Sequence, residues 1–337
     1  MSRPTQPGRP GRRRPSALAM GVGIIALVAI VLVIILVISL LSSGPSAPPI
    51  TSPSSSAAPS SSAVAKPASQ PADCPDVLMI AIPGTWESKS TDDPIHPKAN
   101  PNSLMLKVTA PLQNAFPGAR LEAWTTPYIA QLSNPIAIPP DGQASYTTSR
   151  EQGDSRTRAE LTTMYARCPL TSVILTGFSQ GAAIAGDIAS DIGNGKGPIP
   201  ADNVIGVGLI SDSRREPGYS NTVGPDPTGV GVEVAFNGLD IDGLTLRGQR
   251  PGGFGTLKGR TWSLCGSHDP ICNEPADVFD VNAIATTMPK LQSVLTGNSH
   301  ALYATTQDWS YKGESAVVWM GHWASGLINA APRPKHS

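Results

Sequence analysis

Five short apolar runs alternate with segments of helical periodicity between residues 77 and 330. The runs expected to form strands are Val77–Ile82, Leu121–Thr125, Thr171–Thr176, Val204–Ile210 and Thr261–Cys265. The segments expected to form helices are Ser103–Phe116, Tyr146–Ala166, Gln180–Ile192 and Val317–Ala330. Strands that alternate with helices pair in parallel, and right-handed crossovers place the helices on both faces of the sheet. The pattern predicts an α/β domain with a doubly wound, mostly parallel, five-stranded sheet.

Only the later part of the 337-residue chain has this pattern. Residues 1–16 are basic, residues 17–41 are apolar, and residues 42–73 consist largely of Pro, Ser and Ala. We expect 42–73 to be an extended linker, because it has too few large apolar side chains to offset the entropy of ordering. Residues 74–337 are then a single folded domain.

The apolar run Ala17–Leu41 is 25 residues long and carries no charge. A helix of that length spans about 37 Å, whereas the hydrocarbon core of a bilayer is about 30 Å thick. A secretory signal has an apolar stretch of only about 7–15 residues. Because arginines precede the run, we expect a single transmembrane helix with residues 1–16 in the cytoplasm and the folded domain outside the cell membrane. The alternative is cleavage after the run, which would give a secreted protein.

The charge of the chain argues against nucleic acid as a partner. The 25 basic and 25 acidic residues balance, but five arginines lie before the apolar run and every acidic residue lies after it. The folded domain is therefore mildly acidic and has no basic stripe.

Four cysteines lie in the folded part, at Cys74, Cys168, Cys265 and Cys272. An even number beyond a membrane segment fits two disulfides in an oxidising compartment. Cys265 and Cys272 are close enough to close a small loop, and the other two would then pair by default, although four cysteines permit three connectivities. The spacing does not fit a zinc site, and we expect no metal.

The pentapeptide Gly177-Phe178-Ser179-Gln180-Gly181 has the pattern G-x-S-x-G. It directly follows an expected strand and precedes an expected helix, the setting of the sharp turn that presents a nucleophilic serine in α/β-hydrolases. The helix N-terminus beside the serine favours a developing oxyanion. An ordinary glycine-rich turn is the alternative, and the strand–turn–helix setting favours Ser179 as the nucleophile.

The general base should be a histidine that follows Ser179 in the chain. His300 lies in a turn-rich loop after a helical stretch, where the base of this fold belongs. The other candidates fit less well: His268 adjoins the candidate acid, His322 lies in an apolar helical pattern and is expected to be packed, and His336 lies in the C-terminal tail. The sequence favours His300.

The acid should orient the histidine and stabilise its charged form. Asp269 directly follows the fifth expected strand, within the loop between Cys265 and Cys272. Its rival is Asp212, at the end of the strand that follows the nucleophile. We favour Asp269, because a disulfide across its loop would hold the carboxylate in place.

Two backbone N–H groups are expected to bind the oxyanion. The group of Gln180 follows the nucleophile, and that of Thr85 lies in the loop after the first strand. Gly84-Thr85 could also be a plain strand-ending turn.

Several short motifs together resemble the cutinase-like family of α/β-hydrolases, from about Cys74 to the C-terminus. They are Cys74-Pro75-Asp76, Pro83-Gly84-Thr85, Tyr146 with Ser149-Arg150 and Gly153, Cys168-Pro169, the serine pentapeptide, Cys265 with Asp269-Pro270 and Cys272, and His300 with Tyr303. The resemblance implies a serine ester hydrolase without cofactor or metal, whose triad is Ser179, Asp269 and His300. It also implies the disulfides Cys74–Cys168 and Cys265–Cys272.

The apolar run and linker resemble the membrane-anchored branch of this family in mycolate-containing actinobacteria. This resemblance implies lipid esters of the cell envelope as substrates (phospholipids, acylglycerols or thioesters) and a membrane or cell-wall surface as partner. The alternatives are an acyltransferase that uses the same triad and a catalytically silent lipid-binding module. Residues 213–260 are rich in Gly and Pro, and we expect them to form a long excursion near the active face.

Overall fold

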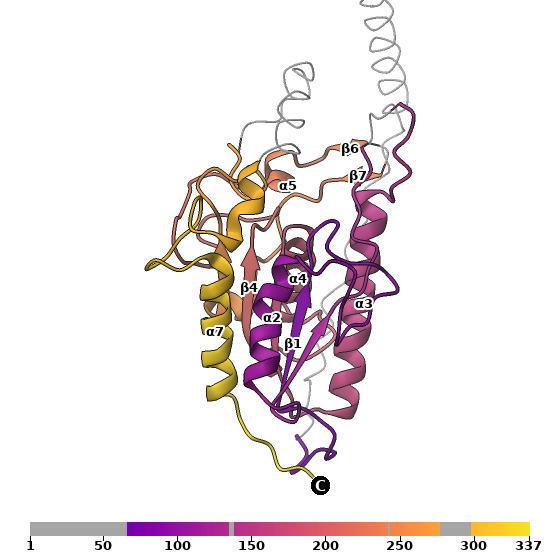
Figure 1. Cartoon of the computed structure of the whole chain (residues 1–337), viewed down its shortest axis with the longest axis vertical. Coiled ribbons are helices and arrows are strands. Elements are labelled where there is room, and N and C mark those ends of the chain that lie inside the picture. The colour runs from indigo at the N-terminus through magenta and orange to yellow at the C-terminus, as the bar shows by residue number, and fades with distance from the viewer. Residues whose placement is uncertain (1–65, 135–137, 242, 277–297) are drawn as a thin grey trace, which may run out of the picture. The chain divides into compact units, whose positions relative to one another are not determined.

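Six parallel strands form the central sheet of the unit Val64–Ser337 in the computed structural model (Figure 1). They are β1 Val77–Ile82, β2 Leu121–Thr125, β3 Ser172–Phe178, β4 Val204–Ile210, β5 Asn221–Thr222 and β8 Thr261–Leu264. Their order is β2-β1-β3-β4-β8-β5, and each neighbouring pair is parallel. The prediction of a mostly parallel sheet is confirmed, but the number of five strands is wrong. The sixth strand, β5, has two residues, too few to show an alternating pattern.

The structure describes residues 66–134, 138–241, 243–276 and 298–337. The expected transmembrane segment, residues 17–41, and most of the expected linker lie outside the described residues. In the four described ranges, no helix has the length and apolar character needed to cross a bilayer.

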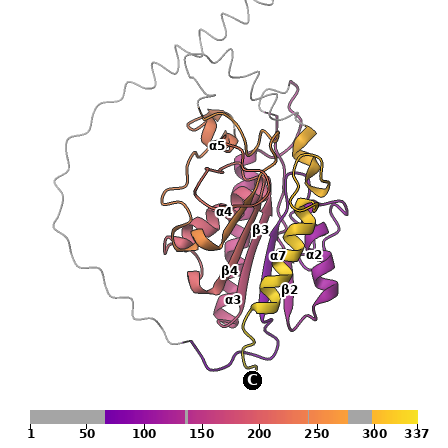
Figure 2. The same ribbon diagram turned by 90° about the vertical axis from the view of Figure 1, so that its left-hand side faces the viewer.

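Helices cover both faces of the sheet. The helices among the described residues are α2 Leu104–Ala115, α3 Tyr146–Arg167, α4 Gln180–Gly193, α5 Val232–Ala235 and α7 Ala316–Ala330, with short 3-10 helices η1 Ala201–Asn203, η2 Gly255–Arg260 and η4 Asn298–Ala304. Figure 2 shows α2 and α7 on one side of the strands and α3 and α4 on the other. Side chains of β1 alternate accordingly: Leu78 and Ile80 pack with α3 and α4, and Val77 and Met79 pack with α2 and α7.

The chain order reverses next to β1. The chain runs from β1 outward to β2 and then returns to β3 on the other side of β1. In open α/β sheets, ligands bind outside the carboxyl ends of the strands at such a switch point. The loop with Thr85 follows β1. The strand β3 continues through Gly177 and Phe178, two residues beyond its predicted end at Thr176, so that Ser179 follows it directly.

Residues 213–260 contain β5, α5, η2 and a small antiparallel pair of strands, β6 Asp240–Ile241 and β7 Leu244–Thr245. The apolar side chains between Val232 and Leu246 form a separate cluster with Tyr146 of α3. Beneath it lies Glu233, whose buried carboxylate is ion-paired with Arg150. The excursion is thus anchored on α3, close to the carboxyl ends of the strands.

Two disulfides join Cys74 to Cys168 and Cys265 to Cys272. This is the pairing expected from the family resemblance. The first ties the segment before β1 to the residue after α3, and the second closes the loop after β8.

Candidate active site

Ser179 occupies a backbone conformation that side chains rarely adopt, with φ 56° and ψ −123°. It lies between β3 and α4, and the two flanking glycines permit the sharp turn. A Cβ at Gly177 would lie 2.2 Å from the carbonyl oxygen of Gly181, and a Cβ at Gly181 would lie 2.1 Å from that of Ile82. The chain therefore needs glycine at both positions to bring the serine to the end of the sheet.

The structure brings the three expected triad residues together. Nε2 of His300 lies 2.8 Å from Oγ of Ser179. Nδ1 of the same ring lies 3.1 Å from both carboxylate oxygens of Asp269. Because the Asp269 carboxylate accepts hydrogen bonds, Nδ1 carries the ring proton and Nε2 is free to accept the serine proton.

The Asp269 side chain is fully buried, and its carboxylate accepts several hydrogen bonds. It accepts hydrogen bonds from the hydroxyls of Ser211 and Tyr303 and from the backbone N–H of Ile271. Burial by itself would raise the pKa of Asp269, but the nearby His300 and the hydroxyl donors outweigh it and hold the pKa below its ordinary value. The carboxylate is therefore ionised at neutral pH.

Two residues around this carboxylate were not expected as site residues. Ser211 directly follows β4 and has φ 55°, and its Oγ lies 3.1 Å from Nδ1 of His300 as well. Tyr303 lies one turn after His300 in η4, and its hydroxyl contacts Asp269 at 2.6 Å. The sequence held a signal for both, since Ser211 is the residue after an expected strand and Tyr303 belongs to the family motif.

The His300 ring is also held from its face. Phe178, the last residue of β3, stacks on it with the ring centroids 4.9 Å apart. Phe178 in turn meets Tyr303 edge-on. The second residue of the serine pentapeptide therefore helps to orient the base.

The other candidates for the acid and the base form contacts outside the triad. Both carboxylate oxygens of Asp212 accept hydrogen bonds from the buried Arg250. The imidazole of His268 is 82% exposed and contacts Asp308. The expectation that His322 is packed is wrong, because its side chain is 70% exposed and its Nδ1 lies within hydrogen-bond distance of Glu314. His336 is exposed in the C-terminal tail, as expected.

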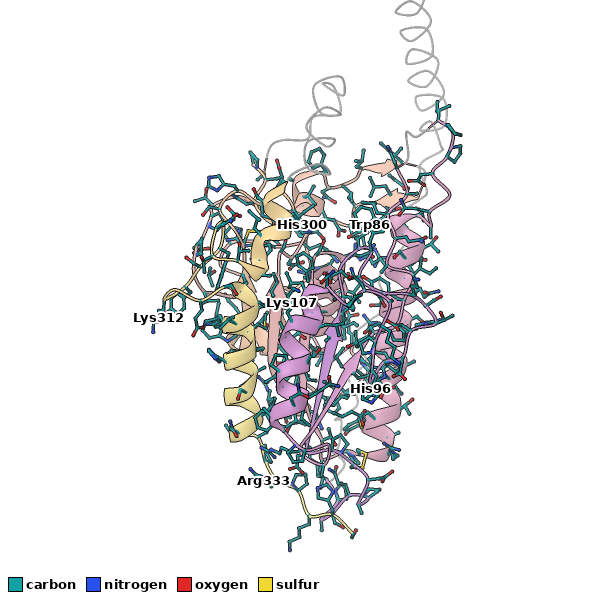
Figure 3. All side chains as sticks on the ribbon, in the orientation of Figure 1. Trp86, His96, Lys107, His300, Lys312 and Arg333 are labelled. Carbon is teal, nitrogen blue, oxygen red and sulfur yellow. A yellow bond between two sulfur atoms is a disulfide. The ribbon has the colours of Figure 1, made fainter. Side chains whose placement is uncertain are left out.

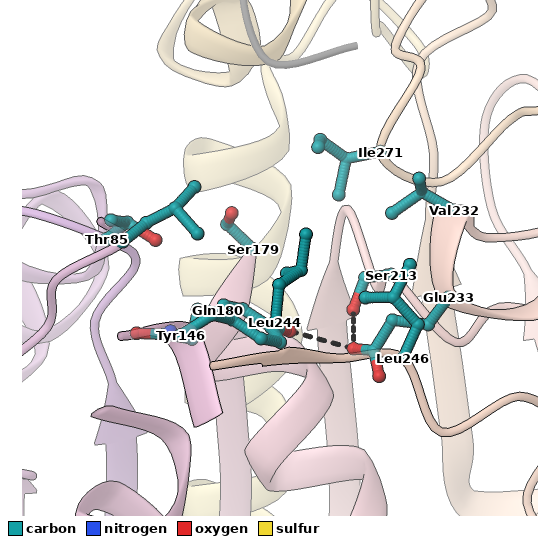
Figure 4. Close-up of a pocket in the computed structure, with 11 residues that line it drawn as sticks. Thr85, Tyr146, Ser179, Gln180, Ser213, Val232, Glu233, Leu244, Leu246 and Ile271 are labelled. Atoms are coloured by element: carbon teal, nitrogen blue, oxygen red, sulfur yellow. Dashed lines mark hydrogen bonds between the residues drawn. The ribbon is translucent and has the colours of Figure 1, made fainter. Parts of the chain in front are cut away.

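Thr85 and Gln180 both line the cavity beside Ser179 (Figure 4). The loop that carries Thr85 is held by Glu87, whose carboxylate accepts hydrogen bonds from the backbone N–H groups of Gly84 and Leu104. Burial raises the pKa of Glu87. Sequence reasoning did not identify Glu87, which joins this loop to the N-terminus of α2.

Two hollows meet at Ser179. A cavity of about 70 Å³ extends toward the excursion and has mainly apolar walls, while a groove of about 420 Å³ extends past His300. His300, Trp86 and Lys107, which are labelled in Figure 3, are among the residues that line this groove. Among the described residues, no group of three or more His, Cys, Asp or Glu side chains could hold a metal ion.

Comparison with known proteins shows the family of the chain. A family model described as Cutinase matches residues 107–284. A Corynebacterium glutamicum protein, the carboxylesterase Culp6 homolog, is 43% identical over 270 residues, which cover 78% of this chain and 84% of the relative.

Two more distant similarities were found. Cutinase 11 of Verticillium dahliae is 29% identical over 172 residues, which cover 47% of this chain and 50% of that protein. The solved catalytic core domain of acetyl xylan esterase from Trichoderma reesei is 18% identical, with a TM-score of 0.44, and the match covers 77% of this chain and 100% of that chain. Given the family match and the 43% identical relative, the chain belongs to the cutinase family and is a serine ester hydrolase.

Proposed function

We propose that Ser179, His300 and Asp269 hydrolyse esters through an acyl-enzyme intermediate. His300 takes the Ser179 proton as the hydroxyl attacks the ester carbonyl, and it then gives that proton to the departing alcohol. Water attacks the acyl-enzyme in the second step, with His300 again as base. Asp269 orients the ring and stabilises its charged form. The observation that carries the proposal is the continuous series of contacts from Oγ of Ser179 through the imidazole to the Asp269 carboxylate.

The oxyanion of the tetrahedral intermediate is bound, in this proposal, by the backbone N–H groups of Thr85 and Gln180. Both residues line the cavity beside Ser179, and Gln180 is the first residue of α4, where N–H groups of a helix have no intrahelical partner. Donors that are already in place stabilise the charge that develops in the transition state.

The proposed substrates are lipid esters of the cell envelope, in the form of phospholipids, acylglycerols or thioesters. Support comes from the apolar side chains beside Ser179, which are Leu132, Val232, Leu244, Leu246 and Ile271. Apolar walls favour an acyl chain over a polar acid.

We also propose that the domain is held at the outer face of the cell membrane by the apolar run of residues 17–41. Membrane fractions of cells that express the full chain should retain the protein through carbonate washing. A variant without residues 1–41, directed outside by a cleavable signal, should appear in the soluble fraction. Equal release of both forms would contradict the proposal.

The catalytic assignment is tested with Ser179→Ala in the variant that lacks residues 1–41. Hydrolysis of p-nitrophenyl butyrate should fall by at least 10⁴-fold, about 5.5 kcal/mol of transition-state stabilisation, without unfolding. The control is Ser155→Ala, an exposed serine on α3, which should retain full activity. A fluorophosphonate probe should label wild-type protein and Ser155→Ala but not Ser179→Ala; labelling of all three would refute the assignment.

A further inference from the structure

The segment Gly84-Thr85-Trp86 after β1 has three successive backbone N–H groups close to the nucleophile. The N–H of Gly84 donates to the Glu87 carboxylate at 3.1 Å. The N–H of Trp86 donates to the carbonyl oxygen of Ala130 at 2.5 Å. Between them, the N–H of Thr85 has no acceptor among the residues that the structure describes. This N–H is therefore available to a substrate oxygen, as the proposed mechanism requires.

The backbone of this segment is strained and has to be held by contacts from outside. Trp86 has φ 63°, a left-handed value that is unfavourable for a bulky residue. Its indole N–H donates to Gln143 at 2.6 Å, and its carbonyl oxygen accepts from the Asn100 side chain at 3.3 Å. Such a conformation persists only where the surrounding structure fixes it. The position of the Thr85 N–H thus depends on groups outside the segment.

Glu87 joins the segment to helix α2. One carboxylate oxygen accepts from the backbone N–H of Leu104 at 2.7 Å, and the other accepts from the Ser103 hydroxyl at 3.1 Å, in addition to the Gly84 N–H. Ser103 and Leu104 are the N-cap and the first residue of α2. The helix is fixed on the sheet, because Leu104 and its neighbour Met105 are buried in the core. The carboxylate therefore links a strained turn to a well-packed element.

Gly84 also lies close to the ring that orients the base. A Cβ at Gly84 would lie 2.7 Å from Cδ1 of Phe178, and the Phe178 ring stacks on His300. The position of Gly84 is thus set by the hydrogen bond to Glu87 and by close packing against Phe178. Because Thr85 follows directly, a displacement of Gly84 would move the Thr85 N–H, and misplacement of a catalytic group by about 1 Å can cost about 10²-fold in rate.

We infer that Glu87 is a positioning residue of the active site, which holds the Thr85 N–H toward the oxyanion by fixing Gly84 to the N-terminus of α2. The inference rests on the proposed roles of Ser179 and Thr85. Glu87 exchanges no proton with the substrate in this role. Its contribution should appear in kcat and not in KM, because the oxygen bound by Thr85 carries its full charge only as the tetrahedral intermediate forms.

The test uses Glu87→Gln in the full chain, solubilised in detergent, with p-nitrophenyl butyrate as substrate. An amide has a single acceptor oxygen, so either Gly84 or Leu104 loses its acceptor. We expect kcat to fall about 30-fold, less than the roughly 10²–10³-fold loss for a missing oxyanion donor, and KM to change less than about threefold. Affinity for butylboronic acid should fall by a similar factor to kcat, because its tetrahedral adduct with Ser179 places an oxygen where the oxyanion forms.

The matched control is Asp92→Asn, in the same connection between β1 and α2. The Asp92 carboxylate also accepts from backbone N–H groups, those of Lys98 and Ala99 at 2.9 and 3.0 Å, and none of its hydrogen bonds among the described residues goes to Gly84-Thr85-Trp86. This variant should lose stability and keep its kcat and its affinity for butylboronic acid. Equal losses of kcat in the two variants would overturn the inference, since any loosening of the connection would then suffice.

Other results would overturn it as well: an unchanged kcat in folded Glu87→Gln, a rise in KM alone, or a loss of kcat without a loss of affinity for butylboronic acid. If Glu87→Gln does not fold, Glu87→Asp serves instead, because its shorter side chain cannot reach both Gly84 and Leu104; wild-type kcat in that variant would count against the role. Ser179→Ala, measured alongside, separates failure of the proposed nucleophile, which would leave Ser179→Ala active, from failure of the Glu87 inference.

Discussion

The hydroxyl of Tyr303 donates a 2.6 Å hydrogen bond to Oδ2 of Asp269, the carboxylate that also contacts His300. The same hydroxyl accepts a hydrogen bond from the backbone N–H of Gly266, at the start of the loop that carries Asp269. Tyr303 therefore links the segment with the base to the loop with the acid. Burial, and then the negative charge of Asp269, raise the pKa of Tyr303 well above its ordinary value, so it remains a donor.

Removal of this donor should weaken catalysis without abolishing it. In Tyr303→Phe, the carboxylate keeps the Ser211 hydroxyl and the Ile271 N–H, so we expect kcat/KM to fall about tenfold, equivalent to ~1.4 kcal/mol. The pKa of Asp269 should rise, and the acid limb of the pH–rate profile should move to higher pH. Tyr311→Phe, at an exposed tyrosine, is the control. A profile that coincides with the wild type would show that the hydroxyl is not needed for positioning.

Replacement of the two aspartates considered as the acid should have different effects, on catalysis for Asp269 and on stability for Asp212. Asp269→Asn keeps the shape of the loop but favours the wrong tautomer of His300, so kcat should fall by about 10³–10⁴-fold, as for the aspartate of other serine hydrolases, with the fold retained. Asp212→Asn breaks the buried pair with Arg250 and should lower the unfolding free energy by about 3–5 kcal/mol. Denaturant unfolding and kcat, measured on both variants, check this. A larger loss of kcat in folded Asp212→Asn would reverse the assignment.

The two disulfides should also differ in effect. They close segments with sequence separations of 94 and 7 residues. In the chain-entropy model, replacing Cys74 and Cys168 by serine costs about 4–5 kcal/mol, whereas replacing Cys265 and Cys272 costs about 2–3 kcal/mol. The short bridge encloses Asp269, and its removal should therefore cause the greater loss of kcat/KM at temperatures where both variants are folded. Equal activity of the two double variants would contradict a positioning role for the short bridge.

Acid should destabilise the domain through Asp187. Burial would raise the pKa of this carboxyl, but Arg150, Arg250 and Arg214 outweigh it and hold the pKa well below its ordinary value of 3.8. A carboxyl with a lowered pKa stabilises the fold above its unfolded-state pKa, and this contribution is lost as the pH falls through the lower, folded-state pKa. Wild-type unfolding free energy should therefore decline as the pH falls below about 4.

The matching variant is Asp187→Asn. It should be less stable than the wild type at pH 7, because three arginines lose a buried partner, and its stability should depend less steeply on pH below 4. Urea titrations at pH 7, 4 and 3 measure both effects. Parallel pH dependence of the two proteins would show that Asp187 is not a main source of acid sensitivity.

The sequence predicted the elements of the fold and the family well, because those signals are local. Strand and helix periodicities placed most boundaries within a residue or two, and the serine pentapeptide stood out by its position between β3 and α4. The boundary of β3 was less accurate, since Gly177 and Phe178 look like turn residues but still pair with β4. The two-residue strand β5 gave no periodic signal at all.

The residues of the chain by themselves predicted a parallel α/β sheet, a sharp serine turn and a resemblance to the cutinase-like family, which in turn implied the two cysteine pairs. Only the tertiary structure decided how Ser211 and Tyr303 surround Asp269, from 58 and 34 residues away in the chain, and how residues of the excursion line the cavity beside Ser179. It also decided that His322 faces solvent. The physical reason is that periodicity and turn chemistry depend on near neighbours, whereas side-chain contacts around a site depend on which strands the sheet places side by side.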